Sequence, residues 1–163
     1  MESYSEGKTA KEELPTHFLY PSALFVHTRP HLVTTILGTC VAVCLWDKKK
    51  KRGGINHYML PYWNGEGLAS PKYGNIAIEK LYENMLRMGS HPQDLVAKVF
   101  GGKEHRQEMS TFNIGRRNVV LAKEILGSLG IEIVASSLGG DLGRKIQFYT
   151  GTGEVRMKYI QNG

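Results

Sequence analysis

Cysteine is scarce in this chain, which has only two among its 163 residues. Cys40 and Cys44 lie four positions apart in the apolar, strand-like run ILGTCVAVCLW. In a strand they would be about 13 Å apart, at about 3.3 Å per residue, whereas a disulfide needs Cα atoms within about 7 Å. We therefore expect two free thiols in a reducing compartment. A zinc site made of Cys40, Cys44 and His57 is a weak alternative, because structural zinc prefers closely spaced cysteines on turns.

Long hydrophobic runs are lacking too. No apolar stretch approaches the roughly 18 residues that a membrane span needs. The first residues, MESYSEGKTAKEEL, are polar and mixed in charge, unlike a secretory signal. We expect a cytoplasmic protein with no membrane insertion.

Several familiar site motifs are absent from the sequence. It contains no Walker-type phosphate loop and no GxGxxG after a strand, which argues against nucleotide chemistry. It contains no GxSxG turn, which argues against a serine hydrolase of that type. We expect neither an organic cofactor nor a bound metal.

Acidic residues are the minority among the charges: 15 Asp and Glu stand against 21 Lys and Arg, giving a formal net charge of +6. This balance favours acidic partners. Four lysines, Lys48–Lys51, and the adjacent Arg52 form one basic tract, which we interpret as the solvated tip of a hairpin. Basic residues are not interleaved with aromatics, so we expect no nucleic-acid binding.

What the sequence does contain is an alternation of strand and helix patterns. Residues 23–37 predict two short strands divided at Arg29-Pro30, and residues 41–46 and 54–60 predict two more, joined by the basic tract. Helical stripes cover 73–88 and 116–129, strands are predicted at 95–100 and 131–136, and RKIQFY–TGTG–EVRMKY predicts a hairpin. This order predicts an α+β fold, with two sheets or one large mixed sheet and helices outside. Residues 1–14 are predicted to be a flexible lead-in to a single domain, 15–163.

The spacing of Cys40 and His57 raises the possibility of a catalytic pair. A hairpin with a tight turn at Lys48-Lys49 would place Asp47 opposite Lys50 and Cys40 directly opposite His57, with Cβ atoms about 4.5–5.5 Å apart. A register shifted by one pair, or a four-residue turn, would leave Cys40 and His57 diagonal but still within reach. An imidazolium beside Cys40 would lower the pKa of the thiol and activate it as a nucleophile.

The surroundings of Cys40 favour it over Cys44 as a nucleophile. Cys44 lies in the middle of the apolar run and is expected in the core, whereas Cys40 follows Gly38-Thr39, where the chain can turn sharply. Main-chain N–H groups at Gly38 and Thr39 could then face a developing oxyanion. Three side chains near in sequence could orient the imidazole: Thr34, Thr35 and Asn56. A structural role for both Cys40 and His57 remains the competing interpretation.

Six stretches of the sequence together resemble the CheD family of chemoreceptor glutamine deamidases. They are TTILGTCVAVCLWD, GGINHYMLP, KYGNIAIEKLYENMLRMG, KVFGG, NIGRRN and LGGDLGRKIQFYTGTGEV. The resemblance runs from about residue 23 to residue 160, and the pairing of the LGTC element with the HYMLP element is its most specific part.

The resemblance implies a β-sandwich-like core of mixed sheets flanked by helices, as in the CheD and cytotoxic necrotizing factor deamidases. It implies hydrolysis of glutamine side-chain amides on the cytoplasmic helices of chemoreceptors, with Cys40 as nucleophile, His57 as base and Thr34 as third catalytic residue. It also implies a CheC-like phosphatase as partner. Two alternatives stay open at this point: a non-catalytic module that binds such a phosphatase or receptors, and hydrolysis of receptor methylesters at the same site.

Overall fold

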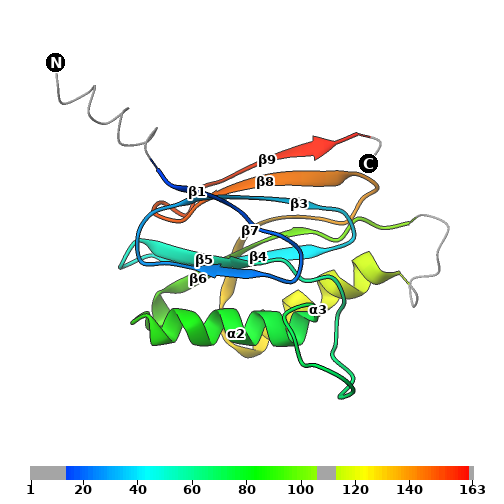
Figure 1. The fold of residues 1–163 in the computed structure, drawn as a ribbon, viewed down its shortest axis with the longest axis horizontal. Coiled ribbons are helices and arrows are strands. Elements are labelled where there is room, and N and C mark those ends of the chain that lie inside the picture. Colours follow the sequence, from blue (N-terminus) through cyan, green and yellow to red (C-terminus); the bar gives the residue numbers. More distant parts are fainter. Residues whose placement is uncertain (1–13, 106–112, 162–163) are drawn as a thin grey trace.

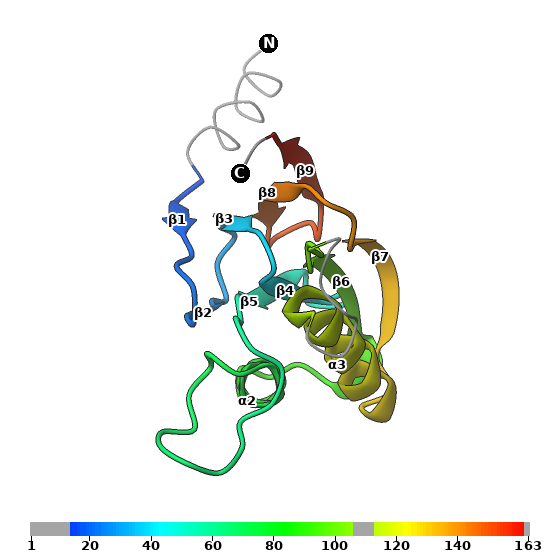
Figure 2. The same cartoon turned by 90° about the vertical axis from the view of Figure 1, so that its right-hand side faces the viewer.

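The computed structural model describes residues 14–105 and 113–161. It has three layers: an outer sheet, a second sheet beneath it, and two helices on the far face of the second sheet (Figures 1 and 2). The outer sheet has the order β1-β3-β8-β9, with bounds Thr16–Phe18, Leu32–Leu37, Gly143–Tyr149 and Val155–Ile160. The inner sheet has the order β2-β5-β4-β6-β7, with bounds Leu24–Val26, Arg52–Asn56, Val41–Asp47, Leu95–Gly101 and Glu132–Leu138. The helices are α2 (Gly74–Arg87) and α3 (Ile114–Ser128), and a short 3-10 helix, η1, covers Pro92–Asp94.

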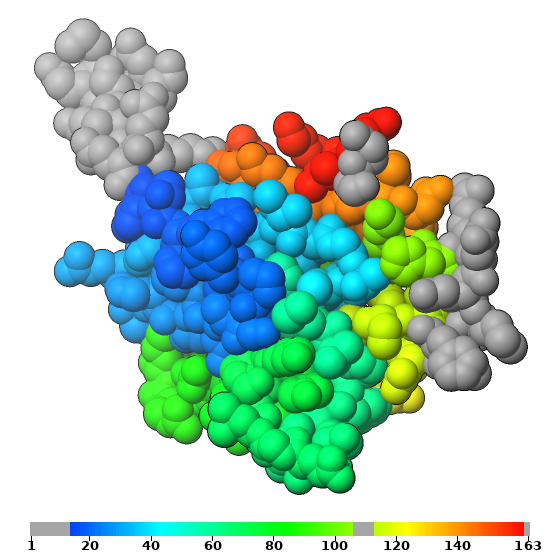
Figure 3. All heavy atoms as spheres, turned by 45° about the vertical axis from the view of Figure 1, so that its right-hand side comes forward, coloured from blue at the N-terminus to red at the C-terminus, as the bar shows by residue number. Residues whose placement is uncertain are grey.

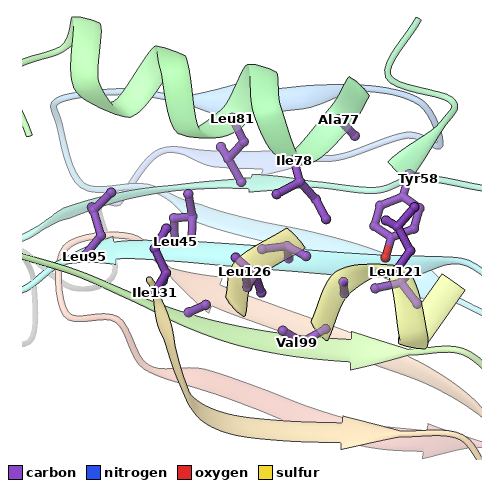
Figure 4. Close-up of a cluster of buried hydrophobic side chains, with 14 of the residues drawn as sticks. Leu45, Tyr58, Ala77, Ile78, Leu81, Leu95, Val99, Leu121, Leu126 and Ile131 are labelled. Carbon is purple, nitrogen blue, oxygen red and sulfur yellow. The ribbon is translucent and has the colours of Figure 1, made fainter. Parts of the chain in front are cut away.

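The inner sheet is buried on both faces, so two separate hydrophobic clusters flank it. Among the described residues, the buried hydrophobic side chains between the two sheets are Leu19, Val33, Leu37, Ala42, Cys44, Ile55, Phe100, Ile146 and Phe148. On the other face, alternate residues of β4 and β6 pack against the apolar stripes of both helices, as Figure 4 shows for Leu45, Val99, Leu81 and Leu126. Burial on both faces explains why β4 reads as a continuous apolar run.

The basic tract is less free than the sequence suggests. Buried Asp47 accepts hydrogen bonds from the main-chain N–H groups of Lys49 and Lys50, which closes a four-residue turn, and Ser90 donates its hydroxyl to the same carboxylate. The Lys50 ammonium and the Arg52 guanidinium donate to the carbonyls of Gly89 and Met88, just after α2. Cations at a helix C-terminus complement its dipole. The tract therefore ties the β4–β5 turn to the end of α2.

The predicted elements are found, with shifted ends. The division at Arg29-Pro30 separates β2 from β3, the C-terminal hairpin is β8–β9, and both helices lie where the periodicity placed them. Helix α3 begins earlier than predicted because Asn113 caps it, accepting a hydrogen bond from the Arg116 N–H. Strand β5 ends at Asn56 instead of residue 60, and β1 was not predicted. The predicted lead-in lies outside the described residues except for Leu14.

Candidate active site

The segment Gly38–Cys40 connects β3 in the outer sheet to β4 in the inner sheet, and hydrogen bonds hold its main-chain carbonyls. The Gly38 carbonyl accepts from the Lys103 N–H at 2.9 Å, and the Cys40 carbonyl from the Gly102 N–H at 2.9 Å. The Thr39 carbonyl accepts from the side-chain amide of Asn118 at 3.0 Å. Three consecutive carbonyls are thus fixed by the segment that follows β6 and by α3.

Glycine is required where β6 approaches this segment. Gly101 and Gly102 have φ values of 114° and 74°, in the region that side chains disfavour. A Cβ on Gly101 would overlap the Cys40 carbonyl oxygen, and a Cβ on Gly115 would overlap the Lys103 carbonyl. The KVFGG stretch therefore serves to bring the backbone of β6 against the backbone of Cys40.

Cys40 lies in the wall of an open pocket of about 410 Å³. The lining residues come from three distant parts of the chain: Thr39, Cys40, Met59, Leu60, Lys72, His105 and Ile114. In Figure 3 the cyan surface that follows β3 lies between the blue-green loop before α2 and the yellow-green start of α3. The thiol is half-buried, and this burial raises its pKa, although its own main-chain N–H acts in the opposite direction.

The second thiol differs from the first in access. Cys44 is 1% exposed in the cluster between the sheets, and burial raises the pKa of its thiol far above the ordinary value. A protonated, enclosed thiol is a poor nucleophile. The expected contrast between a core Cys44 and an accessible Cys40 is confirmed.

His57 follows β5 and is 2% exposed. Its Nδ1 lies 2.7 Å from Thr35 Oγ1 on β3, and this hydroxyl donates its single proton to the Leu19 carbonyl at 2.7 Å. The hydroxyl must therefore accept from Nδ1–H, which leaves Nε2 as the basic nitrogen. Nε2 is buried, and no described residue makes a hydrogen bond to it. An unpartnered buried nitrogen calls for an explanation, and a catalytic role is one.

The protonation states at rest differ from the predicted ion pair. Burial lowers the pKa of His57 to about 4, and burial raises the pKa of Cys40. Both groups are therefore neutral at pH 7. The reason is that each is withdrawn from water, which disfavours the charged form of either.

Cys40 and His57 are diagonal neighbours on one face of the inner sheet. Val41 and Tyr58 form an antiparallel bridge, with N–H···O distances of 3.1 and 3.0 Å, and Cys40 and His57 each precede a member of that pair. Cys40 packs against the cluster between the sheets, and His57 contacts Thr35 across the same space. Direct opposition of the two residues was wrong. The four-residue turn pairs Cys44 with Ile55, which gives the alternative, shifted register.

The structure brings Thr35, and not Thr34, to the imidazole. Along β3 the buried residues are Val33, Thr35 and Leu37, so Thr34 lies on the opposite, outer face of its sheet. Asn56, the third candidate, accepts a hydrogen bond from the Val43 N–H instead. The placement of Thr34 beside His57 is therefore corrected, because the alternation of side chains along β3 separates them.

Sequence reasoning missed Asn118 on α3. It is fully buried, on the same buried face of α3 as Leu121 and Ala122. Its side chain faces the start of β4. Its side-chain N–H₂ group donates to the Thr39 carbonyl and to the Met59 carbonyl, both at 3.0 Å. The available signal was a polar side chain one turn before Ala122 on the predicted apolar stripe of this helix.

Metal-binding and membrane-spanning features were sought in the described part of the chain. Across residues 14–105 and 113–161, no three His, Cys, Asp or Glu side chains are grouped so as to hold a metal ion. Over the same ranges, no helix has the length and apolarity to cross a bilayer.

Comparison with known proteins finds relatives in one family. A family model described as CheD chemotactic sensory transduction matches residues 59–159. A protein of Sulfurimonas denitrificans is 48% identical over 151 residues, covering 91% of this chain and 97% of the relative. One of Trichlorobacter lovleyi is 51% identical over 140 residues, covering 85% and 87%, and one of Archaeoglobus fulgidus is 40% identical over 134 residues, covering 81% and 85%. All three are named probable chemoreceptor glutamine deamidase CheD.

These matches define the class of the protein. The family model begins after His57, but a match over 91% of the chain necessarily includes the segment from Cys40 to His57. The chain belongs to the CheD family.

Proposed function

We propose that this protein is a chemoreceptor glutamine deamidase that uses Cys40 as its nucleophile and His57 as its general base. The observation that carries the proposal is the pairing of a pocket-lining thiol with an unpartnered, buried imidazole nitrogen on the same sheet face. The names of the relatives supply the substrate: glutamine side chains of chemoreceptors.

The first half of the reaction forms a thioester. As the Cys40 sulfur attacks the amide carbon, its proton passes to Nε2 of His57, so that a neutral pair becomes a bound oxyanion and an imidazolium. The imidazolium then gives this proton to the amide nitrogen, the C–N bond breaks, and ammonia leaves. The diagonal placement of Cys40 and His57 is compatible with this step, because catalytic hydrogen bonds tighten when substrate binds.

The second half hydrolyses the thioester. His57 Nε2 takes a proton from water, the resulting hydroxide attacks the acyl carbon, and the sulfur leaves and regains a proton from the imidazolium. The products are glutamate and the free thiol, and overall one water is consumed for each ammonia released. Every proton transfer runs through one ring nitrogen, so the orientation of that ring is decisive.

Thr35 takes the orienting role in this scheme. By accepting from Nδ1–H, its hydroxyl fixes the ring so that Nε2 is the base, and it stabilises the imidazolium when it forms. The main-chain N–H groups of Gly38, Thr39 and Cys40 are the proposed donors to the oxyanion. The carbonyls of Gly38 and Thr39, which share peptide groups with the N–H groups of Thr39 and Cys40, are tied to Lys103 and Asn118, so these two amides need no reorganisation during the reaction.

The pocket suits a glutamine presented by a receptor helix. Met59, Leu60 and Ile114 offer apolar surface for the aliphatic part of the side chain, and Lys72 and His105 add basic groups at the rim. With a net charge of +6, the protein would be steered toward acidic helices. We place this activity in the cytoplasm, and a CheC-like phosphatase is the second partner that the family resemblance suggests.

The proposal is tested with receptor cytoplasmic fragments and mass spectrometry of their glutamines. We expect the unaltered protein to convert specific glutamines to glutamates, and Cys40→Ala to abolish the conversion while the protein stays folded. Cys44→Ala serves as the matched control and should retain activity. A folded protein that binds receptors without converting glutamine would instead be the non-catalytic module, and hydrolysis of methylesters alone would make it an esterase.

A further inference from the structure

Asn118 is a fully buried polar side chain that has no part in the proposed transfer of protons. It lies on the inner face of α3, and Tyr58 donates its hydroxyl to the main-chain carbonyl of Asn118 at 2.6 Å. Figure 4 shows this hydroxyl directed toward α3. This bond holds the main chain of α3 at Asn118, and the Asn118 side chain reaches Thr39 and Met59, two residues that line the pocket.

The orientation of the Asn118 amide is set by its partners. Both N–H groups of Nδ2 point to carbonyl oxygens, of Thr39 and of Met59, which can only accept. One of these residues precedes Cys40 and the other lies two positions after His57. A single side chain therefore bridges the two segments that carry the thiol and the imidazole.

This bridge carries a cost in stability. Asn118 Oδ1 is buried, and no described residue makes a hydrogen bond to it. An unsatisfied buried acceptor destabilises the folded protein, but an apolar residue at this position would leave the Thr39 and Met59 carbonyls without their donor. The asparagine thus leaves one of its own atoms unsatisfied, and in return it holds the carbonyls of Thr39 and Met59 together.

The bond to Thr39 has a direct consequence for the next amide. In a trans peptide the C=O of one residue and the N–H of the next point in opposite directions. Because Asn118 draws the Thr39 carbonyl toward α3, the Cys40 N–H is turned away from α3, and this N–H lies beside its own thiol. Because the oxyanion forms on the carbon that the Cys40 sulfur attacks, the N–H of the same residue is a natural donor to it.

We propose that Asn118 is a positioning residue that aims the Cys40 N–H at the oxyanion by holding the Thr39 carbonyl. The inference rests on the proposed function, since it concerns the same reaction at the same site. Asn118 touches neither substrate nor thiol and acts only through the peptide between Thr39 and Cys40.

The test compares Asn118→Leu with the unaltered protein in three measurements: kcat and KM for glutamine deamidation, the rate at which iodoacetamide alkylates Cys40, and thermal stability. Loss of one oxyanion donor costs about 100- to 1,000-fold in kcat. We expect a fall in kcat of at least about tenfold. The effect is smaller than loss of a donor because the Cys40 N–H is still present and only its orientation is no longer held. KM and the alkylation rate should change little, because binding and the thiol itself are untouched.

One control and one further variant keep the outcomes distinct. Ser90→Ala removes another buried hydrogen bond, to Asp47, far from the pocket, and should lower stability with kcat unchanged. Asn118→Ala is the second variant if Asn118→Leu does not fold. The proposal is overturned if kcat is retained, or if kcat and alkylation fall together, since that would mean collapse of the whole site. Failure of the deamidase assignment looks different: the unaltered protein would then show no conversion.

Discussion

At the scale of single residues, the hydroxyl of Thr35 decides how His57 can act. It has one proton, and the Leu19 carbonyl takes it, so the oxygen is left to accept from the ring. Thr34 carries the same hydroxyl on the other face of β3. The two threonines therefore form a natural matched pair, identical in chemistry and opposite in direction.

Substituting each threonine by valine tests this difference. Thr35→Val removes the acceptor for Nδ1–H and should lower kcat for deamidation by at least about tenfold, a loss in the range of general acid–base effects. Thr34→Val should leave kcat nearly unchanged. Steady-state kinetics on a receptor fragment decide the matter. The reverse ranking would show that the outward threonine is the one that functions.

His57 also makes the stability of the protein depend on pH. Its pKa is about 4 in the folded protein, because of burial, and ordinary, about 6.5, in the unfolded chain. The unfolded chain therefore binds more protons between these values, and stability is complete above about pH 6.5 and falls as pH drops toward 4. The total effect is about 3 kcal/mol.

Chemical denaturation at a series of pH values measures this dependence. We expect His57→Gln to flatten the decline between pH 6.5 and 4, because glutamine takes up no proton there. The lowered pKa of Asp47, which its hydrogen bonds to Lys50, Ser90 and Lys49 maintain against burial, adds a separate loss at lower pH. If the free energy of unfolding fell equally with pH for both proteins between pH 6.5 and 4, the assignment of a neutral, buried His57 would be contradicted.

At the scale of elements, the end of β6 shapes the active segment. Gly101 has a positive φ, and a Cβ there would overlap the Cys40 carbonyl. Gly101→Ala should therefore destabilise the protein by more than about 1 kcal/mol and reduce deamidation. Gly127→Ala is the control: in α3 its Cβ would meet nothing within 4 Å, so it should stabilise by about 0.5–1 kcal/mol. Denaturant melts and activity assays that rank the two variants alike would contradict this account.

Helices and strands could be predicted from the sequence where a single local pattern determines them. The stripe from Ile78 to Met85 indicated α2, and the proline at 30 divided β2 from β3. The register of β4 and β5 could not be predicted, because it depends on how Asp47 closes the turn. The choice between Thr34 and Thr35 failed for a similar reason. In LVTTIL each face carries two aliphatic residues and one threonine, so the alternation does not say which face is buried.

In the candidate site, too, the local features could be predicted from the sequence and the long-range contacts could not. Cys40 and His57 could be singled out because a hairpin joins them, and a hairpin is a local feature of the sequence. The contacts that hold the site come from far along the chain: Gly102 and Lys103 after β6, and Asn118 on α3. Such contacts exist only once both helices and both sheets are in place, so no local sequence pattern could predict them.

At the scale of the whole molecule, the three layers place one thiol at an opening and enclose the other. Cys44 lies between the sheets, where the cluster around Phe100 and Phe148 excludes water, whereas Cys40 lies where β3 crosses to β4 and the pocket opens. The two thiols share one strand run and differ only in what the surrounding layers leave exposed.

The most direct test of the account is the rate at which iodoacetamide alkylates each cysteine in the folded protein, followed by peptide mapping. We predict that Cys40 is modified and that deamidase activity is lost in step with it, that Cys44 reacts only after unfolding, and that His57→Gln slows the reaction of Cys40. A Cys40 as inert as Cys44, or one whose modification leaves deamidation intact, would contradict the claim that this sulfur performs the chemistry.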